Sequence, residues 1–177
     1  MIARHSWRGD ETVTLRRENL LEIARFLRND PAFQMNFLMD LTAVDYLTFG
    51  KEAESQGAFV NAGIRLRQPM NVPDAEPWPG PATAARFEVV YHFFSMSFKQ
   101  RIRVKVPLEE SDPVIDSLTP LWASADWFER EIWDMYGVRF SGHPNLKRLL
   151  MYEEFEGYPL RKDYPVNKRQ PLIGPVN

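Results

Sequence analysis

The chain has 177 residues, of which 44% are hydrophobic, and a net charge of −2, which suits one folded domain with an apolar core and excludes a largely disordered chain. It has no cysteine, which excludes disulfides, cysteine nucleophiles, zinc–thiolate sites and ordinary iron–sulfur ligation. A charge so close to zero gives no field that favours nucleic acid, and no run reaches the roughly 18 apolar residues of a membrane span.

The first predicted elements are a helix over residues 17–29 and a strand over residues 37–47. Apolar residues recur at helical spacing in the first segment, and Pro31 ends it. The second segment, FLMDLTAVDYL, is rich in apolar and β-branched residues. A shorter strand is predicted over residues 59–66.

Residues 68–85, QPMNVPDAEPWPGPATAA, hold too many prolines for a helix or a central strand, so we expect a loop inserted in a sheet. The clearest β signal follows in residues 86–96 and 101–108, which SFKQ joins as in a hairpin. Arg101, Arg103 and Lys105 alternate with apolar residues in the second strand. Such a basic row suits nucleic acid, but the solvated face of an antiparallel sheet explains it better.

Two further helices are predicted, a short one over residues 113–122 and a better one over residues 127–136. Asp126 can cap the second helix, with Glu129 three residues later, and Gly137 suits the position just past its end.

The charged residues of helix 127–136 lie on different faces. Arg130, Glu131 and Asp134 occupy one arc, in which Arg130 and Asp134 are spaced to form a pair. Glu129 falls inside the apolar arc, where a carboxylate must find a cation or a hydrogen-bond donor. After Gly137 the periodicity fades into a proline-broken, basic tail with apolar residues, which needs a surface on its own domain or on a partner.

Three functions compete for this region. Acid–base catalysis by Glu129 and Glu131 is disfavoured because the two side chains point about 200° apart on a helix. A metal site is disfavoured because the three histidines are far apart in sequence. A docking element with charged contacts to another chain, and a helix that folds back its own tail, remain comparable. No glycine-rich nucleotide motif and no GxSxG nucleophile motif is present.

Several stretches of the sequence resemble a known protein family. The stretch WFEREIWDMYGVRFSGHPNLKRLLMY, residues 127–152, resembles the signature of the thirty-kilodalton subunit of respiratory complex I, which in bacteria is the C subunit of the proton-pumping NADH–quinone oxidoreductase. GYPLRKDYP at 157–165, LTAVDY at 41–46 and the strand pair EVVYHFF and RIRVKV are similar to the same family. The resemblance covers most of residues 37–166.

The resemblance implies a non-catalytic subunit without a cofactor of its own. NADH oxidation, the flavin, the iron–sulfur clusters and quinone reduction would belong to partner subunits. This chain would support assembly of the peripheral arm, chiefly against the quinone-site subunit that resembles a hydrogenase large subunit and against its iron–sulfur neighbours. It would lie peripherally on the cytoplasmic side of a bacterial inner membrane, without nucleic acid, and its tail would gain order on assembly.

We therefore predict an α+β fold with a mixed or antiparallel sheet of four to six strands, helices on one face and an extended C-terminal tail. The α+β domain would span residues 1–136 and the tail residues 137–177. The residues expected to hold helix and tail together through charged pairs, and to extend into the interface, are Glu129, Arg130, Glu131, Asp134, His143, Lys147, Arg148, Arg161, Lys162 and Asp163.

Two alternatives stay open. One is the equivalent subunit of a related membrane-bound hydrogenase or of a ferredoxin- or coenzyme-dependent complex, which the neighbouring subunits would distinguish. The other is a stand-alone acid–base enzyme that uses Glu129 or Glu131 with His143.

Overall fold

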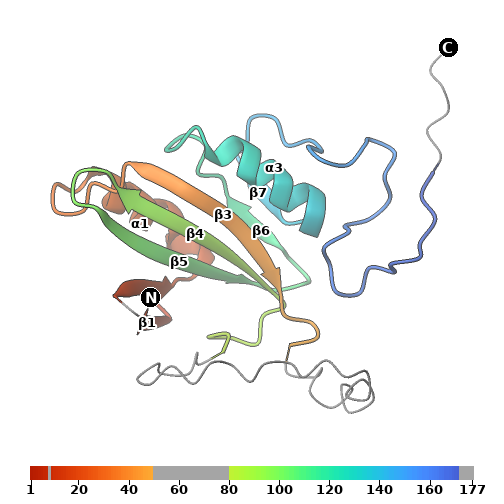
Figure 1. Ribbon diagram of the computed structural model, residues 1–177, viewed down its shortest axis with the longest axis horizontal. Helices are drawn as coiled ribbons and strands as arrows, with labels where there is room; N and C mark the ends of the chain where they lie inside the picture. Colours follow the sequence, from red (N-terminus) through yellow and green to blue (C-terminus); the bar gives the residue numbers. More distant parts are fainter. Residues whose placement is uncertain (8, 50–79, 172–177) are drawn as a thin grey trace, which may run out of the picture.

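The computed structural model describes residues 1–7, 9–49 and 80–171 and has a five-stranded sheet at its centre (Figure 1). The strand order is β1-β2-β5-β4-β3, and the neighbours are antiparallel except for the parallel pair β2 and β5. The predicted mixed sheet is confirmed. Its strands are β1 (Ala3–Trp7), β2 (Asp10–Thr14), β3 (Phe37–Asp45), β4 (Phe87–Ser95) and β5 (Gln100–Leu108).

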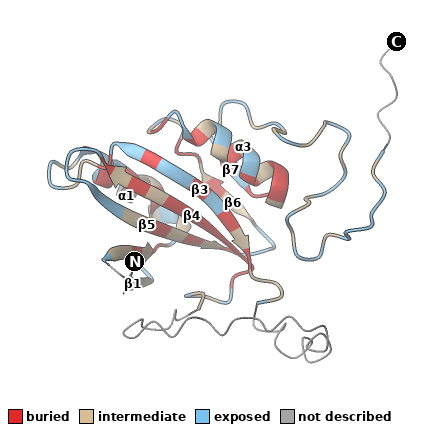
Figure 2. Ribbon diagram, in the orientation of Figure 1, coloured by how far each residue is buried: buried red, intermediate tan, exposed pale blue. Residues whose placement is uncertain are grey.

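Strand β4 forms the centre of the core because it lies between β3 and β5. Phe87, Val89, Tyr91 and Phe93 alternate along it and are all buried on the face that the helices cover. Figure 2 shows β4 buried along most of its length, whereas much of the C-terminal segment is exposed. The hairpin of β4 and β5 agrees with the prediction, and Gln100 pairs with Ser95 beside its turn.

Within the described residues, two helices cover one face of the sheet, as predicted. The short 3-10 helix η1 (Arg17–Asn19) leads into α1 (Leu20–Asn29), which buries its apolar stripe and ends before Pro31. The helix α3 (Ala125–Tyr136) packs against β3 and contributes Ala125 and Ile132 to the same core.

The predicted helix over residues 113–122 is wrong. Its first part is the strand β6 (Val114–Asp116), which pairs in parallel with β7 (Arg139–Ser141). Ile115 and Leu118 enter the core from an extended segment and the turn that follows it. Pro120 lies inside the predicted helix, where it has no N–H to donate and cannot continue a helix.

Other differences lie at the N-terminus and in the loop. The strands β1 and β2 were not predicted, because polar and charged residues interrupt any apolar alternation in their short sequences, ARHSW and DETVT. The strand predicted over residues 59–66 lies outside the described residues. Of the proline-rich loop 68–85, residues 80–85 are described, and they contain neither helix nor strand.

The C-terminal tail leaves the α+β body after β7. Val138 and Phe140 are buried in the body, so the segment outside it begins at Gly142. The tail, residues 142–171 of the described chain, contains turns and bends but no helix or strand. Figure 1 shows it on the side of α3 away from α1.

Candidate functional site

Helix α3 carries a fully buried carboxylate at Glu129. Its Oε1 accepts a hydrogen bond from the Leu118 N–H at 2.7 Å, and its Oε2 accepts from the hydroxyls of Ser117 at 2.6 Å and Thr119 at 3.3 Å. Burial raises the pKa of Glu129 to about 7, although these three donors oppose the rise. The predicted need for donors is confirmed, whereas the expected charged pair is replaced by neutral partners.

The predicted cap of this helix is also wrong. The helix begins at Ala125, so Asp126 lies in its first turn, and the N-cap residue Ser124 makes no side-chain capping hydrogen bond. Gly137 does end the helix in a left-handed conformation, with φ of 76°, as predicted.

A second fully buried carboxylate, Asp134, binds the beginning of the tail. Its Oδ1 lies 2.6 Å from Nη1 of Arg148, and its Oδ2 accepts hydrogen bonds from the N–H groups of Leu149, Leu150 and Met151 at 2.8–3.0 Å. Burial raises the pKa of this carboxyl, but the hydrogen bonds from Met151, Arg148 and their neighbours outweigh it, so the pKa lies below its usual value. Asp134 thus pairs with the tail and not with Arg130 as expected.

The guanidinium of Arg148 organises the next turn of the tail. Its Nη2 donates to the carbonyl oxygens of Phe155 at 2.7 Å and Gly157 at 3.3 Å. Its carbon lies within 6.0 Å of the ring centres of Trp133, Phe155 and Tyr158. One side chain therefore links Asp134 and Trp133 of α3 to two aromatic rings of the tail.

The tail adds a small aromatic cluster of its own. Phe155 packs edge-on against Tyr152 and stacks on Tyr164, with ring centres 5.7 and 6.1 Å apart. The Tyr152 hydroxyl donates to the Pro171 carbonyl at 3.0 Å, which returns the far end of the tail to its beginning.

The end of α3 forms a second contact with the tail. The Leu160 N–H donates to the Met135 carbonyl at 3.1 Å, and Nε of Arg161 donates to the Tyr136 carbonyl at 2.6 Å. These bonds satisfy carbonyl groups that a helix end otherwise leaves without partners. A Cβ at Gly137 would lie 2.6 Å from the Tyr158 ring, so the close approach requires glycine there.

A third contact joins the tail to the sheet through Arg86, whose side chain is 7% exposed. Its guanidinium binds Asp45 at 2.9 Å, Asp163 at 2.6 Å and also Glu110. Asp45 accepts in addition the Lys162 N–H at 2.9 Å. The Arg86 hydrogen bond holds the pKa of Asp163 below its usual value, and the ion pairs raise the pKa of Arg86.

His143 has a structural position. Its Nδ1 accepts the Asn145 N–H at 3.0 Å, which leaves Nε2 as the protonated nitrogen of the neutral ring. Nε2 lies 3.2 Å from the Asp126 carbonyl oxygen and 3.1 Å from Asp126 Oδ1, so it donates to the first turn of α3.

The remaining predicted residues divide into bound and exposed side chains. Arg130 donates to the carbonyl oxygens of Lys147 and Arg148, each at 3.2 Å, and lies over the Trp127 ring. Glu131, Lys147 and Lys162 are exposed, although the backbone N–H of Lys162 is bound as described.

This arrangement does not form an acid–base site. Glu129 points into the core, Glu131 is exposed, and His143 is bonded to Asp126, so the three groups do not converge on one substrate position. Among residues 1–7, 9–49 and 80–171, no cluster of three or more histidine, aspartate or glutamate side chains could hold a metal ion.

The basic row of β5 is matched by its own neighbours. Arg101 binds Asp10, Arg103 donates to the Thr12 hydroxyl, and Lys105 binds the buried Glu88 at 2.7 Å. These internal partners agree with the solvated face of a structured sheet, in which Arg101 and Lys105 are paired with acids and Arg103 with a neutral hydroxyl.

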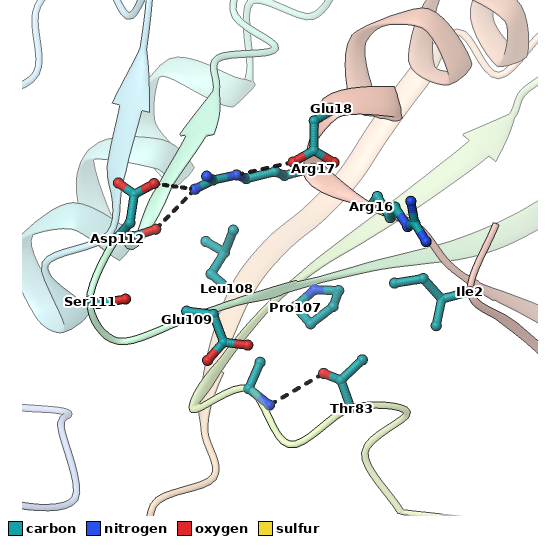
Figure 3. A pocket seen from close by; sticks show the side chains of 11 residues that line it. Ile2, Arg16, Arg17, Glu18, Thr83, Pro107, Leu108, Glu109, Ser111 and Asp112 are labelled. Atoms are coloured by element: carbon teal, nitrogen blue, oxygen red, sulfur yellow. Dashed lines mark hydrogen bonds and ion pairs between the residues drawn. The ribbon is translucent and has the colours of Figure 1, made fainter.

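A separate hollow of about 450 Å³ lies between η1 and the end of β5. Figure 3 shows the side chains that line it. Arg17 crosses it and binds Asp112 at 2.7 Å. Glu18 and Glu109 add two more acids, and Arg16 adds one more base. The hollow therefore carries charges of both signs and does not form a uniform site for an ion.

Sequence reasoning missed three residues of this site. Asp45 and Arg86 come from strand ends far from the tail in sequence, and Ser117 lies in the segment predicted as a helix. The stretch LTAVDY did single out Asp45 by family resemblance. Its role was not apparent because its partners are contributed by other elements.

Comparison with known proteins gives a consistent result. The description "Respiratory-chain NADH dehydrogenase, 30 Kd subunit" belongs to the family whose sequence model matches residues 13–170. The C subunit of NADH-quinone oxidoreductase from Citrifermentans bemidjiense is 44% identical over 95% of this chain and 83% of its own length. The corresponding protein of Roseiflexus sp. strain RS-1, which has the same name, is 40% identical over 93% of this chain and 75% of its own length.

Solved structures share the fold. The trypsin-resistant fragment (1-134) of Nqo5 is 31% identical, covers 78% of this chain and 83% of its own, and has a TM-score of 0.53. A chain of the archaeal membrane-bound sulfane sulfur reductase covers 93% of this chain and 78% of its own at a TM-score of 0.61, and its 17% identity shows the fold alone. No helix within the described part of the chain is long and apolar enough to cross a membrane. The chain belongs to the 30 kDa subunit family of respiratory-chain NADH dehydrogenase, whose bacterial relatives here are C subunits of NADH-quinone oxidoreductase.

Proposed function

We propose that this chain is a non-catalytic, cofactor-free subunit that supports assembly of the peripheral arm of a bacterial NADH–quinone oxidoreductase. It would contact chiefly the hydrogenase-like subunit at the quinone site and its iron–sulfur neighbours, and reach the cytoplasmic side of the membrane only through them. Electron transfer from NADH to quinone, coupled to proton translocation, would take place on other subunits.

The observation that carries this proposal is that the tail is fixed to the body on one side and exposes apolar side chains on the other. Its inner side is fixed to the body by buried charged groups, of which Asp134 and Arg86 make the most contacts. Its outer side leaves apolar side chains in solvent, with Leu150 57% and Leu160 49% exposed. An apolar surface on a fixed backbone can bind a partner without a further cost in chain entropy.

Helix α3 adds an exposed aromatic side chain beside the start of the tail. Trp127 is 63% exposed on its outer side, and Arg130 lies over the ring while donating to the tail backbone. Tryptophan and arginine are among the residue types most enriched in side chains that dominate binding energy. We name Trp127, Leu150 and Leu160 the docking surface.

The composition supports a role without a cofactor. The sequence has no cysteine, so this chain offers no thiolate to an iron–sulfur cluster. The three groups that an acid–base mechanism would need, Glu129, Glu131 and His143, point to different places. The flavin and clusters are accordingly assigned to partners.

An affinity purification tests the proposal. The chain serves as bait in gently solubilised native membranes, and the co-purifying proteins are identified by mass spectrometry. We expect a cysteine-rich iron–sulfur subunit, a hydrogenase-like subunit and a nucleotide-binding flavoprotein. Recovery of the first two without the flavoprotein would point to a hydrogenase-type complex, and recovery of none would contradict the assembly role.

A matched pair of variants tests the docking surface itself. Leu160→Asp places a charge on this surface and is expected to reduce recovery of the partners at least about tenfold, because burying an unpaired charge opposes binding. Phe98→Asp changes a residue of similar exposure, 46%, in the turn between β4 and β5, and is expected to leave recovery unchanged. Equal recovery with both variants would show that the docking surface does not bind the partners.

A further inference from the structure

Three side-chain oxygens form a closed triangle inside the protein, between α3 and the turn that follows β6. Ser117 Oγ lies 2.6 Å from Glu129 Oε2 and 2.8 Å from Thr119 Oγ1, and Thr119 Oγ1 lies 3.3 Å from Glu129 Oε2. All three distances fall within hydrogen-bonding range. The triangle therefore has three sides that can each hold one proton.

The number of available protons depends on Glu129. Each hydroxyl carries one proton, so Ser117 and Thr119 together supply two, and an ionised carboxylate supplies none. With Glu129 ionised, one side of the triangle must remain without a hydrogen bond. With Glu129 protonated, the carboxyl donates to Ser117, Ser117 donates to Thr119, and Thr119 donates back to the carboxyl.

The charges around Glu129 also favour the neutral form. The titratable groups that face it are Asp126 on its own helix and Tyr91 on β4, and Asp116 on β6 acts on Tyr91 as well. None of them is a cation. The strands β3 and β7 also pack on α3, and neither contributes a charged side chain to the described hydrogen bonds of this carboxylate. An ionised carboxylate in this interior would have neutral donors alone to balance its charge.

We propose that Glu129, Ser117 and Thr119 form a buried proton-binding site in which the neutral carboxyl closes a ring of three hydrogen bonds. The ring holds the turn 117–119 against α3. Loss of the proton opens one side of the ring and loosens this contact. The raised pKa of Glu129, about 7, places the change near neutral pH.

The site has a consequence for the tail, which rests on the proposed function. The same helix holds the tail at Asp134 and at the carbonyls of Met135 and Tyr136. A proton bound at Glu129 would therefore stabilise the element that positions the docking surface. Proton binding itself needs no partner, so it can be measured on the full chain alone, and failure of the assembly role would leave it unaffected.

The test is a carboxyl titration of the full chain with ¹³C-labelled glutamate, followed by NMR from about pH 4 to pH 9. Loss of one resonance in Glu129→Gln assigns that carboxyl, and Glu131→Gln, on the exposed side of the same helix, gives the matched control. We expect Glu129 to titrate near pH 7, well above the ordinary value for glutamate, and the Glu131→Gln variant to leave this titration unchanged. Titration of Glu129 near pH 4.5 would overturn the proposal.

A second variant tests whether the ring of hydrogen bonds, and not burial alone, raises the titration midpoint of Glu129. Thr119→Val removes one corner, so the neutral carboxyl can no longer close three hydrogen bonds, and the Glu129 titration midpoint is expected to fall. If burial alone raised the midpoint, loss of the Thr119 donor would raise it further, because that donor stabilises the ionised form. An unchanged or higher midpoint in this variant would therefore exclude the ring, and the result does not depend on Glu129→Gln folding.

The pH dependence of urea unfolding tests the proton-binding site independently of the NMR titration. Because the folded pKa lies above the unfolded value, the stability from the neutral carboxyl is fully present below pH 4.5 and is lost as pH rises through about 7. The unfolding constant of the wild type should rise between these values by up to about 300-fold relative to Glu129→Gln. Parallel pH profiles of the two proteins would contradict the site.

Discussion

Arg148 Nη1 lies 2.6 Å from Asp134 Oδ1, so a partly buried side chain of the tail and a buried side chain of α3, 14 positions apart, form an ion pair. The N–H groups of the next three tail residues bind the other oxygen of the same carboxylate. Residues 148–151 are thus part of the folded domain. The expected ordering on assembly is not needed for them, because their contacts lie within the chain.

Replacement of Arg148 should release this part of the tail. Arg148→Met removes the only cation bonded to Asp134 in the described part of the chain and leaves a buried carboxylate without its partner, which costs about 3–5 kcal/mol of unfolding free energy. Urea denaturation measures the loss. Hydrogen exchange should show faster exchange at the amides of Leu149, Leu150 and Met151, because these bind the same carboxylate.

Lys147→Met is the matched control for that variant. Lys147 is the exposed neighbour of Arg148, and its replacement removes the same charge from the same turn. We expect a change within about 0.5 kcal/mol and unchanged exchange rates. Equal effects of the two substitutions would show that charge in this turn matters and the ion pair does not.

Acid should loosen the tail. The pKa values of Asp134, Asp45 and Asp163 are lowered in the folded chain, below the ordinary 3.8. Each carboxylate therefore contributes stability that is present above pH 3.8 and is lost as pH falls through its folded pKa. Exchange rates of the tail amides between about pH 2 and pH 6, corrected for intrinsic rates, should rise relative to those of β4 below about pH 4. The idea fails if tail and β4 lose protection together or the tail stays protected at about pH 2.

Substitutions at two glycines distinguish the cost of disturbing the tail contact from the cost of backbone strain. Gly137 and Gly142 have nearly the same backbone conformation, with φ of 76° and 77°. A Cβ added at Gly137 would lie 2.6 Å from the Tyr158 ring, whereas a Cβ added at Gly142 would have no neighbour within 4 Å. Gly142→Ala should cost about 1 kcal/mol from strain alone. Gly137→Ala should cost about 2 kcal/mol more, since the tail must move. Equal losses in thermal denaturation would mean that the contact of Tyr158 with α3 contributes nothing.

Some features of the fold and of the site follow from local sequence, and others do not. The hairpin of β4 and β5 was predictable because alternating apolar residues and a short polar turn are local signals. The burial of Glu129 was predictable from its position in the apolar arc of the helix. The partner of Asp134 was not predictable, because helical spacing offered Arg130 and the tail supplied Arg148 instead.

The segment after Pro113 shows a second limit of prediction from local sequence. Its apolar residues fit a short helix as well as an extended strand, and β7, which pairs with it, lies more than about 20 positions later. The contacts of Arg86 with Asp45 and Asp163 likewise join three distant parts of the sequence. Local patterns hold no information on such partners. The family resemblance drew attention to the stretches that hold Asp45 and Asp163, but not to Arg86 or to the segment after Pro113.

Tyr91 offers a test of the interior beside Glu129. Its hydroxyl is buried and has no hydrogen-bond partner among the described residues. Tyr91→Phe should therefore stabilise the fold by about 1 kcal/mol, because it removes an unsatisfied polar group. Tyr46→Phe, which loses a 2.8 Å hydrogen bond to Glu88, should destabilise it by about 1 kcal/mol. A clear loss of stability in Tyr91→Phe, seen in urea denaturation, would show that a water molecule serves the hydroxyl.

The central claim is that this chain supports assembly and takes no part in the electron-transfer chemistry. The most direct measurement is made in cells whose own gene for this subunit is replaced by Trp127→Ala combined with Leu160→Asp, by comparing the amount of intact complex with its NADH–quinone activity per complex. We predict at least about a tenfold loss of assembled complex and unchanged activity in each complex that remains. A normal amount of complex with reduced activity per complex would contradict the account.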